Sequence, residues 1–181
     1  MLFRSPGGED DRVIAAIEAK KLVVKAVVNT HGHVDHVVGV AALQARYDVP
    51  FMVHAADREL VSQAKAYASY FGLRHSGEPR FGDDLQDGQE LPLGESTVRV
   101  IATPGHTPGG VCLLFGEDLL SGDTLFAQSV GRTDLEGGDS ATLMRSIREN
   151  LLTLPDATRV HPGHGPRTTI GAERRHNPFL R

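Results

Sequence analysis

The amino-acid sequence lacks tryptophan and contains a single cysteine, Cys112. One cysteine excludes an internal disulfide and is compatible with a reducing compartment. No apolar run approaches the roughly 18 residues of a membrane-spanning helix, and residues 1–8 lack the long apolar core of a signal peptide. From these absences we expect a soluble, cytoplasmic protein.

Long blocks of one charge are also missing. The 181 residues carry a net charge of −4, with acidic and basic side chains mixed along the chain. This distribution argues against a general nucleic-acid binder and against a membrane-surface protein. The length and the 40% hydrophobic content fit one domain over residues 1–181, long enough to bury a core. Nine histidines are a high count for such a chain, so their places matter.

The apolar pattern predicts both helices and strands. Residues 22–29 are apolar except for Lys25 and Asn29 and are rich in β-branched side chains, which is typical of a strand covered on both faces. A first helix is expected to begin at Asp10 or Asp11. Further helices are expected at residues 34–47, 57–70, 139–152 and 168–175, and strands at 51–54, 89–93, 96–103, 111–115, 118–121 and 158–161. This order favours sheets packed between helices.

Four residues that can bind a metal follow the apolar run of residues 22–28 within one short stretch, residues 30–36. His31 and His33 alternate, so in an extended chain they reach the same side. Asp35 and His36 lie where the next helix begins and can face another direction. The loop can therefore serve two neighbouring ions, and neutral imidazole with carboxylate suits Zn²⁺ or Fe²⁺.

Further donors lie beyond this loop, again after predicted strands. His106 and His164 each stand in a Pro-Gly-His sequence, in which proline and glycine give a stiff turn that presents the imidazole. His161 competes with His164 as a ligand, but the repeated Pro-Gly-His setting favours His164. Asp123 ends an apolar strand in a Gly-Asp pair, and its two carboxylate oxygens can bridge two cations.

The sequence His-Gly-His-Val-Asp-His at residues 31–36, followed by His106, Asp123 and His164, resembles the metallo-β-lactamase superfamily. The resemblance is closer to its glyoxalase II (hydroxyacylglutathione hydrolase) branch, in the short bacterial form. This closer resemblance lies in residues 121–126, 129–134, 161–173 and 177–179. It extends from Pro6 to the C-terminus and implies an αββα sandwich with a dinuclear metal site at the strand ends.

The resemblance also implies a ligand set and two metal ions. One metal would be bound by His31, His33 and His106, the second by Asp35, His36 and His164, and Asp123 would bridge them. Two divalent ions are expected, with zinc favoured and iron or manganese as alternatives.

The beginning of the chain departs from the family pattern. The family has two or three strands before the Pro-Gly-Gly turn, whereas this chain starts almost at that turn, at residues 6–8. We therefore expect the first N-terminal strands to be lacking. An exposed strand edge or apolar face should result, with weaker stability or self-association into a homo-oligomer.

The function implied by the resemblance is hydrolysis of a thioester of the S-lactoylglutathione type. A hydroxide held by the two metals would attack the carbonyl, with Asp35 and Asp123 as the catalytic residues that orient it. The expected partner is a small-molecule thioester, a glutathione conjugate, and neither nucleic acid nor membrane. A β-lactamase or lactonase is disfavoured because nothing here resembles their substrate loops.

Two other functions remain open. A persulfide dioxygenase of the same superfamily would bind one iron through His31, His106 and Asp123. The other possibility is a remnant of the family without catalytic activity, which only the short N-terminus suggests. Near the predicted site, Arg132 either pairs with Asp134 to brace the loop or meets a substrate carboxylate. His54 and Cys112 are expected to be structural.

Overall fold

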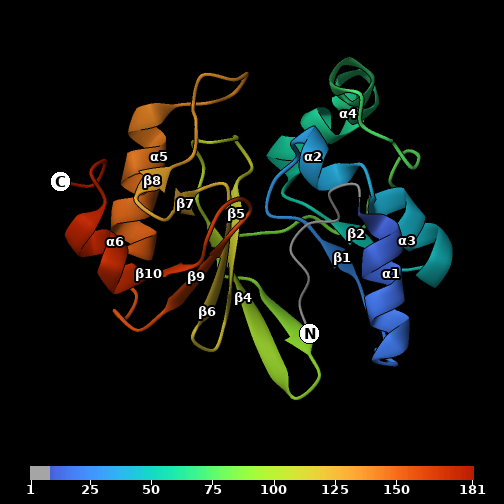
Figure 1. Cartoon of the computed structure of the whole chain (residues 1–181), viewed down its shortest axis with the longest axis horizontal. Helices are drawn as coiled ribbons and strands as arrows, with labels where there is room; N and C mark the ends of the chain where they lie inside the picture. Colours follow the sequence, from blue (N-terminus) through green and yellow to red (C-terminus); the bar gives the residue numbers. More distant parts are fainter. Residues whose placement is uncertain (1–8) are drawn as a thin grey trace. The chain divides into compact units, whose positions relative to one another are not determined.

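The computed structural model describes residues 9–181, which divide into two compact units on either side of the Asp84–Leu85 bond (Figure 1). We describe each unit by itself. The expectation of one domain over residues 1–181 stays a prediction.

The first unit is built from short strands and several helices. Its elements are α1 (Asp10–Ala19), β1 (Val27–Val28), α2 (Val34–Val37), α3 (Val40–Tyr47), β2 (Phe51–Met52), the 3₁₀ turn η1 (Ala55–Asp57) and α4 (Arg58–Phe71). Strands β1 and β2 are parallel, with Val27 opposite Phe51 and Val28 opposite Met52. Side chains from all four α-helices, both strands and the segments beside β2 form one apolar core, which consists of Ile17, Val27, Val37, Val40, Leu43, Val49, Phe51, Val53, Val61 and Ala64.

The strand expected at residues 22–29 is much shorter, because only Val27 and Val28 form a ladder. Its partner β2 also has two residues, so residues 22–26 pair with no strand in the described part of the chain. The expectation that both faces are covered is wrong at Val23, whose surface is 76% exposed. Whether strands precede α1 concerns residues 1–8, which lie outside the described residues.

Two expected helices are interrupted. The helix expected at residues 34–47 is interrupted at Val38 and Gly39, where Val38 caps the end of α2 and Gly39 caps the start of α3, in keeping with the low helix propensity of glycine. The helix expected at residues 139–152 begins as α5 (Ser140–Ser146) and continues as a π-helical turn, η2 (Ile147–Leu151). Among the described residues, no helix is long and apolar enough to cross a membrane.

The second unit contains a six-stranded sheet in the order β10-β9-β6-β5-β4-β3. Its strands are β3 (Glu90–Leu93), β4 (Ser96–Ala102), β5 (Val111–Phe115), β6 (Asp118–Gly122), β9 (Arg159–Pro162) and β10 (Thr168–Thr169). The pair β6 and β9 is parallel, while every other neighbouring pair is antiparallel. A separate hairpin consists of β7 (Leu125–Phe126) and β8 (Ser129–Val130). The pattern missed β7, β8 and β10 because two-residue strands are too short to show periodicity.

Strand direction determines where the loops of this sheet lie. Because β4 and β6 are both antiparallel to β5, they run the same way, and β9 runs parallel to β6. The carboxyl ends of these three strands therefore lie at one edge of the sheet. The segments that follow them contain His106, Asp123 and His164.

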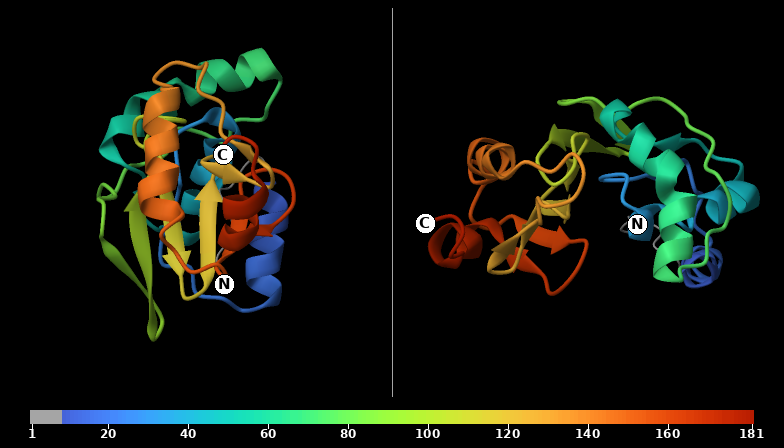
Figure 2. Two further views of the ribbon diagram at one scale, coloured as in Figure 1. Left: turned by 90° about the vertical axis from the view of Figure 1, so that its left-hand side faces the viewer. Right: turned by 90° about the horizontal axis from the view of Figure 1, so that it is seen from above.

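Helices α5 and α6 (Ile170–His176) lie against one face of this sheet (Figure 2). Side chains from the helices and from alternate positions of the strands form the second core, which consists of Ile101, Cys112, Leu119, Leu125, Leu143, Ile147, Leu151, Val160 and Ile170. Packing in this core holds the strands in place, and the loops at their carboxyl ends are therefore anchored to a rigid sheet.

Truncation of a core side chain on β6 tests this support. Leu119 is fully buried, so Leu119→Ala should lower the free energy of unfolding by about 2–5 kcal/mol, as is typical for a buried leucine. Denaturant unfolding measures the change. Leu135→Ala, at a side chain that is 42% exposed, should change it by about 0.5 kcal/mol or less. Equal effects of the two substitutions would contradict this core.

Candidate metal centre

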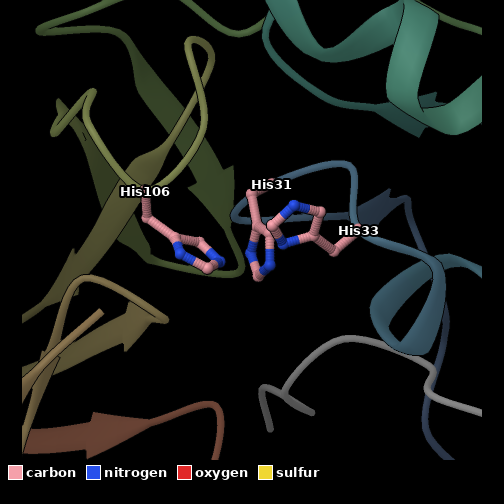
Figure 3. A group of neighbouring side chains, drawn as sticks. All are labelled: His31, His33 and His106. Atoms are coloured by element: carbon pink, nitrogen blue, oxygen red, sulfur yellow. The ribbon is translucent and has the colours of Figure 1, made fainter. Parts of the chain in front are cut away.

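The first unit presents four donors from the loop after β1 and the start of α2. His31 and His36 are buried, and their rings lie 4.1 Å apart between centroids. The His31 and His33 rings meet edge to face at 5.0 Å (Figure 3). Asp35 Oδ2 lies 3.4 Å from His36 Nε2. The loop therefore gathers the imidazoles and carboxylate that the sequence placed there.

The loop is held by two side chains outside the ligand set. The Gly32 N–H donates to Asp57 Oδ2 at 2.8 Å, and Asp57 is completely buried. A Cβ at Gly32 would lie 2.7 Å from the Asp57 carbonyl oxygen, so only glycine allows this close approach. Asn29 Nδ2 donates to the carbonyl of His36 at 2.7 Å. These hydrogen bonds fix both ends of the donor loop.

His106 lies in the turn after β4 (Figure 3). The turn passes so close to α5 that a Cβ at Gly105 would lie 2.2 Å from Leu143 N, and the Gly105 φ of +132° also requires glycine. His106 is buried, and its Nδ1 bonds the carbonyl oxygen of Arg132 at 2.8 Å. The imidazole is thus oriented by the backbone of another loop.

Asp123 and His164 follow β6 and β9. Asp123 Oδ2 lies 3.5 Å from His164 Nε2 and 3.8 Å from His106 Nε2. His161 Nε2 instead contacts Asp118 Oδ1 at 2.6 Å, near the amino end of β6. The structure therefore places His164 beside Asp123 and directs His161 to a different carboxylate.

Arg132 and Asp134 form the brace that the sequence suggested. Arg132 Nε and Nη2 donate to the two Asp134 carboxylate oxygens at 2.7 and 2.8 Å. These hydrogen bonds lower the pKa of Asp134 to about 2, and both side chains are exposed. The alternative assignment of Arg132, to a substrate carboxylate, is not needed to explain its position.

The donor set fits a divalent metal. Every presumed ligand offers an imidazole nitrogen or a carboxylate oxygen, which are the donors that Zn²⁺, Fe²⁺ and Mn²⁺ accept. His31 Nδ1 contacts Thr30 Oγ1 at 3.1 Å, and His106 Nδ1 contacts the Arg132 carbonyl. Such contacts to one ring nitrogen orient the other, Nε2, as the metal ligand.

Residues expected to be structural lie apart from this chemistry. His54 Nδ1 accepts the backbone N–H of Ala56 at 3.3 Å and so caps η1. Cys112 is fully buried, and burial raises the pKa of its thiol to about 11. A thiol with such a pKa stays protonated and is a poor nucleophile at neutral pH.

The sequence reasoning missed Asp57 as a support. A usable signal was available, because Asp57 follows β2 and β2 pairs with the strand that leads into the donor loop. An aspartate after a neighbouring parallel strand is placed at the same sheet edge as the donors. This signal gives the place of Asp57 but not its partner, because the partner is the backbone N–H of Gly32, which carries no sequence signature.

Comparison with known proteins identifies the family. A model of the metallo-beta-lactamase superfamily matches residues 5–164 of the chain. The chain therefore belongs to the metallo-β-lactamase superfamily, and its fold class is the one that the sequence predicted.

One curated protein and two solved structures illustrate what the chain is similar to within this superfamily. The hydroxyacylglutathione hydrolase GloC of Haemophilus influenzae is 39% identical, over 97% of this chain and 84% of that protein. The crystal structure of TTHA1623 in a di-iron-bound form is 41% identical with a TM-score of 0.88, covering 97% of this chain and 87% of that one. ETHE1 from Myxococcus xanthus is 30% identical with a TM-score of 0.80, covering 97% and 71%.

Removal of the Asp57 carboxylate tests the support of the donor loop. Asp57→Ala should lower the free energy of unfolding by about 1–3 kcal/mol, since it takes away the acceptor of the Gly32 N–H. Glu59→Ala, in the exposed first turn of α4, is the control and should change it by about 0.5 kcal/mol or less. Denaturant unfolding of both variants measures the difference. An Asp57→Ala protein as stable as the control would contradict the assigned support.

Acid titration tests the Arg132–Asp134 brace. The pKa of Asp134 lies below its ordinary value of 3.8, at about 2, so the pair stabilises the folded state above that ordinary value. This contribution is lost as the pH falls through about 2. Carboxyl carbon NMR should show the depressed pKa, and Arg132→Gln should return it toward 3.8 while keeping the backbone carbonyl. An unchanged titration in that variant would rule out the brace as the cause.

Proposed function

We propose that this protein is a metal-dependent hydrolase of thioesters, of the S-lactoylglutathione type, that belongs to the glyoxalase II branch. The observation that supports this proposal best is the set of donors. The groups of histidine and aspartate that could hold a metal ion include all seven residues that were predicted as ligands from the sequence. The 39% identity to the Haemophilus influenzae hydroxyacylglutathione hydrolase supports the substrate class.

The proposed assignment divides the donors between two metals. His31, His33 and His106, drawn in Figure 3, would bind the first ion. Asp35, His36 and His164 would bind the second. Asp123 would bridge, as the approach of its carboxylate to both His106 and His164 supports. Zinc is favoured by the mixed imidazole and carboxylate set, while the di-iron form of TTHA1623 supports iron.

Bound divalent metals would lower the pKa of a water molecule and polarise a carbonyl, which is the chemistry that acyl hydrolysis requires. Asp35 and Asp123 would accept hydrogen bonds from the attacking water and so direct its lone pair toward the carbonyl carbon. The departing thiolate is a stable anion, so the reaction needs no strong general acid, and none is assigned. The expected setting is the cytoplasm, with a glutathione conjugate as the partner.

The second candidate is an iron-dependent persulfide dioxygenase. It would use a single iron bound by His31, His106 and Asp123, and the similarity to ETHE1 from Myxococcus xanthus gives it some support. The hydrolase is favoured because Asp35, His36 and His164 also form a group suited to a metal. These three donors have no role in a site with one iron.

Loss of a donor tests the proposed hydrolase. His33→Ala and Asp123→Ala should each abolish hydrolysis of S-lactoylglutathione, because each removes a ligand while the fold remains. Activity is measured by thiol release and the fold by circular dichroism. His176→Ala, at an exposed histidine outside the donor groups, should keep full activity. Full activity in His33→Ala or Asp123→Ala would refute the proposal.

Metal content separates the two candidates. The hydrolase should contain two metals per chain and release thiol from lactoylglutathione, whereas the dioxygenase should contain one iron and consume oxygen with glutathione persulfide. Metal analysis and both assays on one purified sample distinguish them. Oxygen consumption without thioester hydrolysis would replace the proposed function by the second candidate.

A further inference from the structure

The C-terminal helix α6 and the residue that caps its end provide a buried polar pair that none of the metal chemistry uses. Glu173 and Asn177 are 2% and 1% exposed, although neither belongs to a donor group. Both lie in segments that resemble the family, and the residue pattern alone assigned neither of them a role. Buried carboxylates and amides are retained only where hydrogen bonds compensate their desolvation, so their partners indicate their role.

These partners lie in the β7–β8 hairpin. Glu173 Oε2 accepts the backbone N–H of Gln128 at 2.8 Å and the side-chain amide of Asn177 at 2.8 Å. The Asn177 amide also donates to the carbonyl of Ser129 at 3.0 Å. Thr168 donates to Glu173 Oε1. Glu173 and Asn177 therefore bind the turn of the hairpin through Gln128 and Ser129, and we call the two residues the Glu–Asn clamp.

The turn that the clamp binds contains a residue with an unfavourable backbone conformation, Gln128. Gln128 has a φ of +57°, in the left-handed region that a residue with a Cβ seldom adopts. A strained backbone of this kind persists only where its surroundings over-determine it. The hydrogen bond from Gln128 N–H to the buried carboxylate supplies that constraint directly at the strained residue.

The other end of the hairpin supports two of the presumed ligands. Gly131 packs against the backbone of Asp123, where a Cβ would lie 1.9 Å from the Asp123 carbonyl oxygen. The Gly131 N–H donates to the carbonyl of Thr124 at 3.1 Å. The next residue, Arg132, supplies the carbonyl that bonds His106 Nδ1 at 2.8 Å. Only three residues, 129–131, thus separate Gln128, which the clamp holds, from Arg132, whose carbonyl orients His106.

We propose that Glu173 and Asn177 are positioning residues for the metal centre. By fixing the β7–β8 hairpin they hold the Arg132 carbonyl in place, which keeps the His106 proton on Nδ1 and presents Nε2 as the ligand. The inference rests on the proposed metal binding but not on the identity of the substrate. It explains why helix α6, which contributes no donor, contains a buried carboxylate.

A purely structural role is the competing explanation. A clamp that only stabilises the fold would change the unfolding midpoint but leave the His106 tautomer in the folded protein unchanged. The tautomer is therefore the decisive measurement, and it is made without metal on ¹⁵N-histidine-labelled protein by imidazole nitrogen chemical shifts.

The test uses the whole chain and two near-isosteric variants. Glu173→Gln replaces one acceptor oxygen by a donor, and Asn177→Asp removes the donor to Ser129 and adds a second carboxylate beside Glu173. His176→Gln, an exposed change on the same helix, is the matched surface control. Ile147→Val, in the core of the same unit, controls for lowered stability alone.

In the metal-free wild-type protein, His106 should be protonated on Nδ1 and not on Nε2. Both clamp variants should show a mixture of the two tautomers and should bind zinc about 10–100-fold more weakly, the loss typical of removing an outer support of a metal ligand. Zinc affinity is measured by competition with a chromophoric chelator, below the unfolding midpoint of every variant. The two controls should keep the wild-type tautomer and affinity.

Each outcome decides the inference. A wild-type His106 tautomer in Glu173→Gln would overturn it, whatever happens to stability or to zinc affinity. Loss of the wild-type tautomer and zinc affinity in Ile147→Val as well would also overturn it, since lowered stability would then suffice. If Asn177→Asp does not fold, Glu173→Gln decides alone. A wild-type protein that binds two metals but hydrolyses no thioester would refute the proposed function and leave this inference standing.

Discussion

The common direction of β4, β6 and β9 is the constraint on which the second half of the site depends. Because all three strands run the same way, the segments that follow them emerge at one sheet edge. His106, Asp123 and His164 can then approach one another although about 60 residues of sequence separate the first from the last. The core beneath the sheet, formed with α5 and α6, keeps these strand ends in register.

Hydrogen bonds that involve a backbone group, made with residues outside the donor set, hold the donor loops in place. Asp57 accepts the Gly32 N–H within the first unit, and the Arg132 carbonyl bonds His106 within the second. At both places a glycine, Gly32 or Gly131, permits a contact too close for any Cβ. Each unit therefore has a glycine in the loop beside its donors. The missing side chain lets the backbone pack directly against a neighbouring segment of the same unit. Fixed donors are what a metal requires, since ligands that must reorganise bind it more weakly.

Much of the fold followed from the sequence. The start of the first helix at residue 10, the helix over residues 58–71 and the strands from 90 to 122 lie within a residue or two of their predicted places, because their apolar periods are long enough to be read. The run at 22–29 was overestimated, because β-branched residues predict a strand whether or not a partner exists to pair with them. Strands β7, β8 and β10 were missed, since two residues have no period.

The sequence by itself determined the candidate donors and their order, because imidazole and carboxylate side chains after apolar runs are visible as residue types. It also determined the family, through the same spacing. The sequence favoured His164 over His161 through its Pro-Gly-His setting, and the tertiary structure places His164 beside Asp123 and His161 beside Asp118. The tertiary structure alone brought Asp57 to Gly32 and Glu173 to Gln128. The physical reason is that these supports act on backbone N–H and C=O groups, which every residue has and which only folding places.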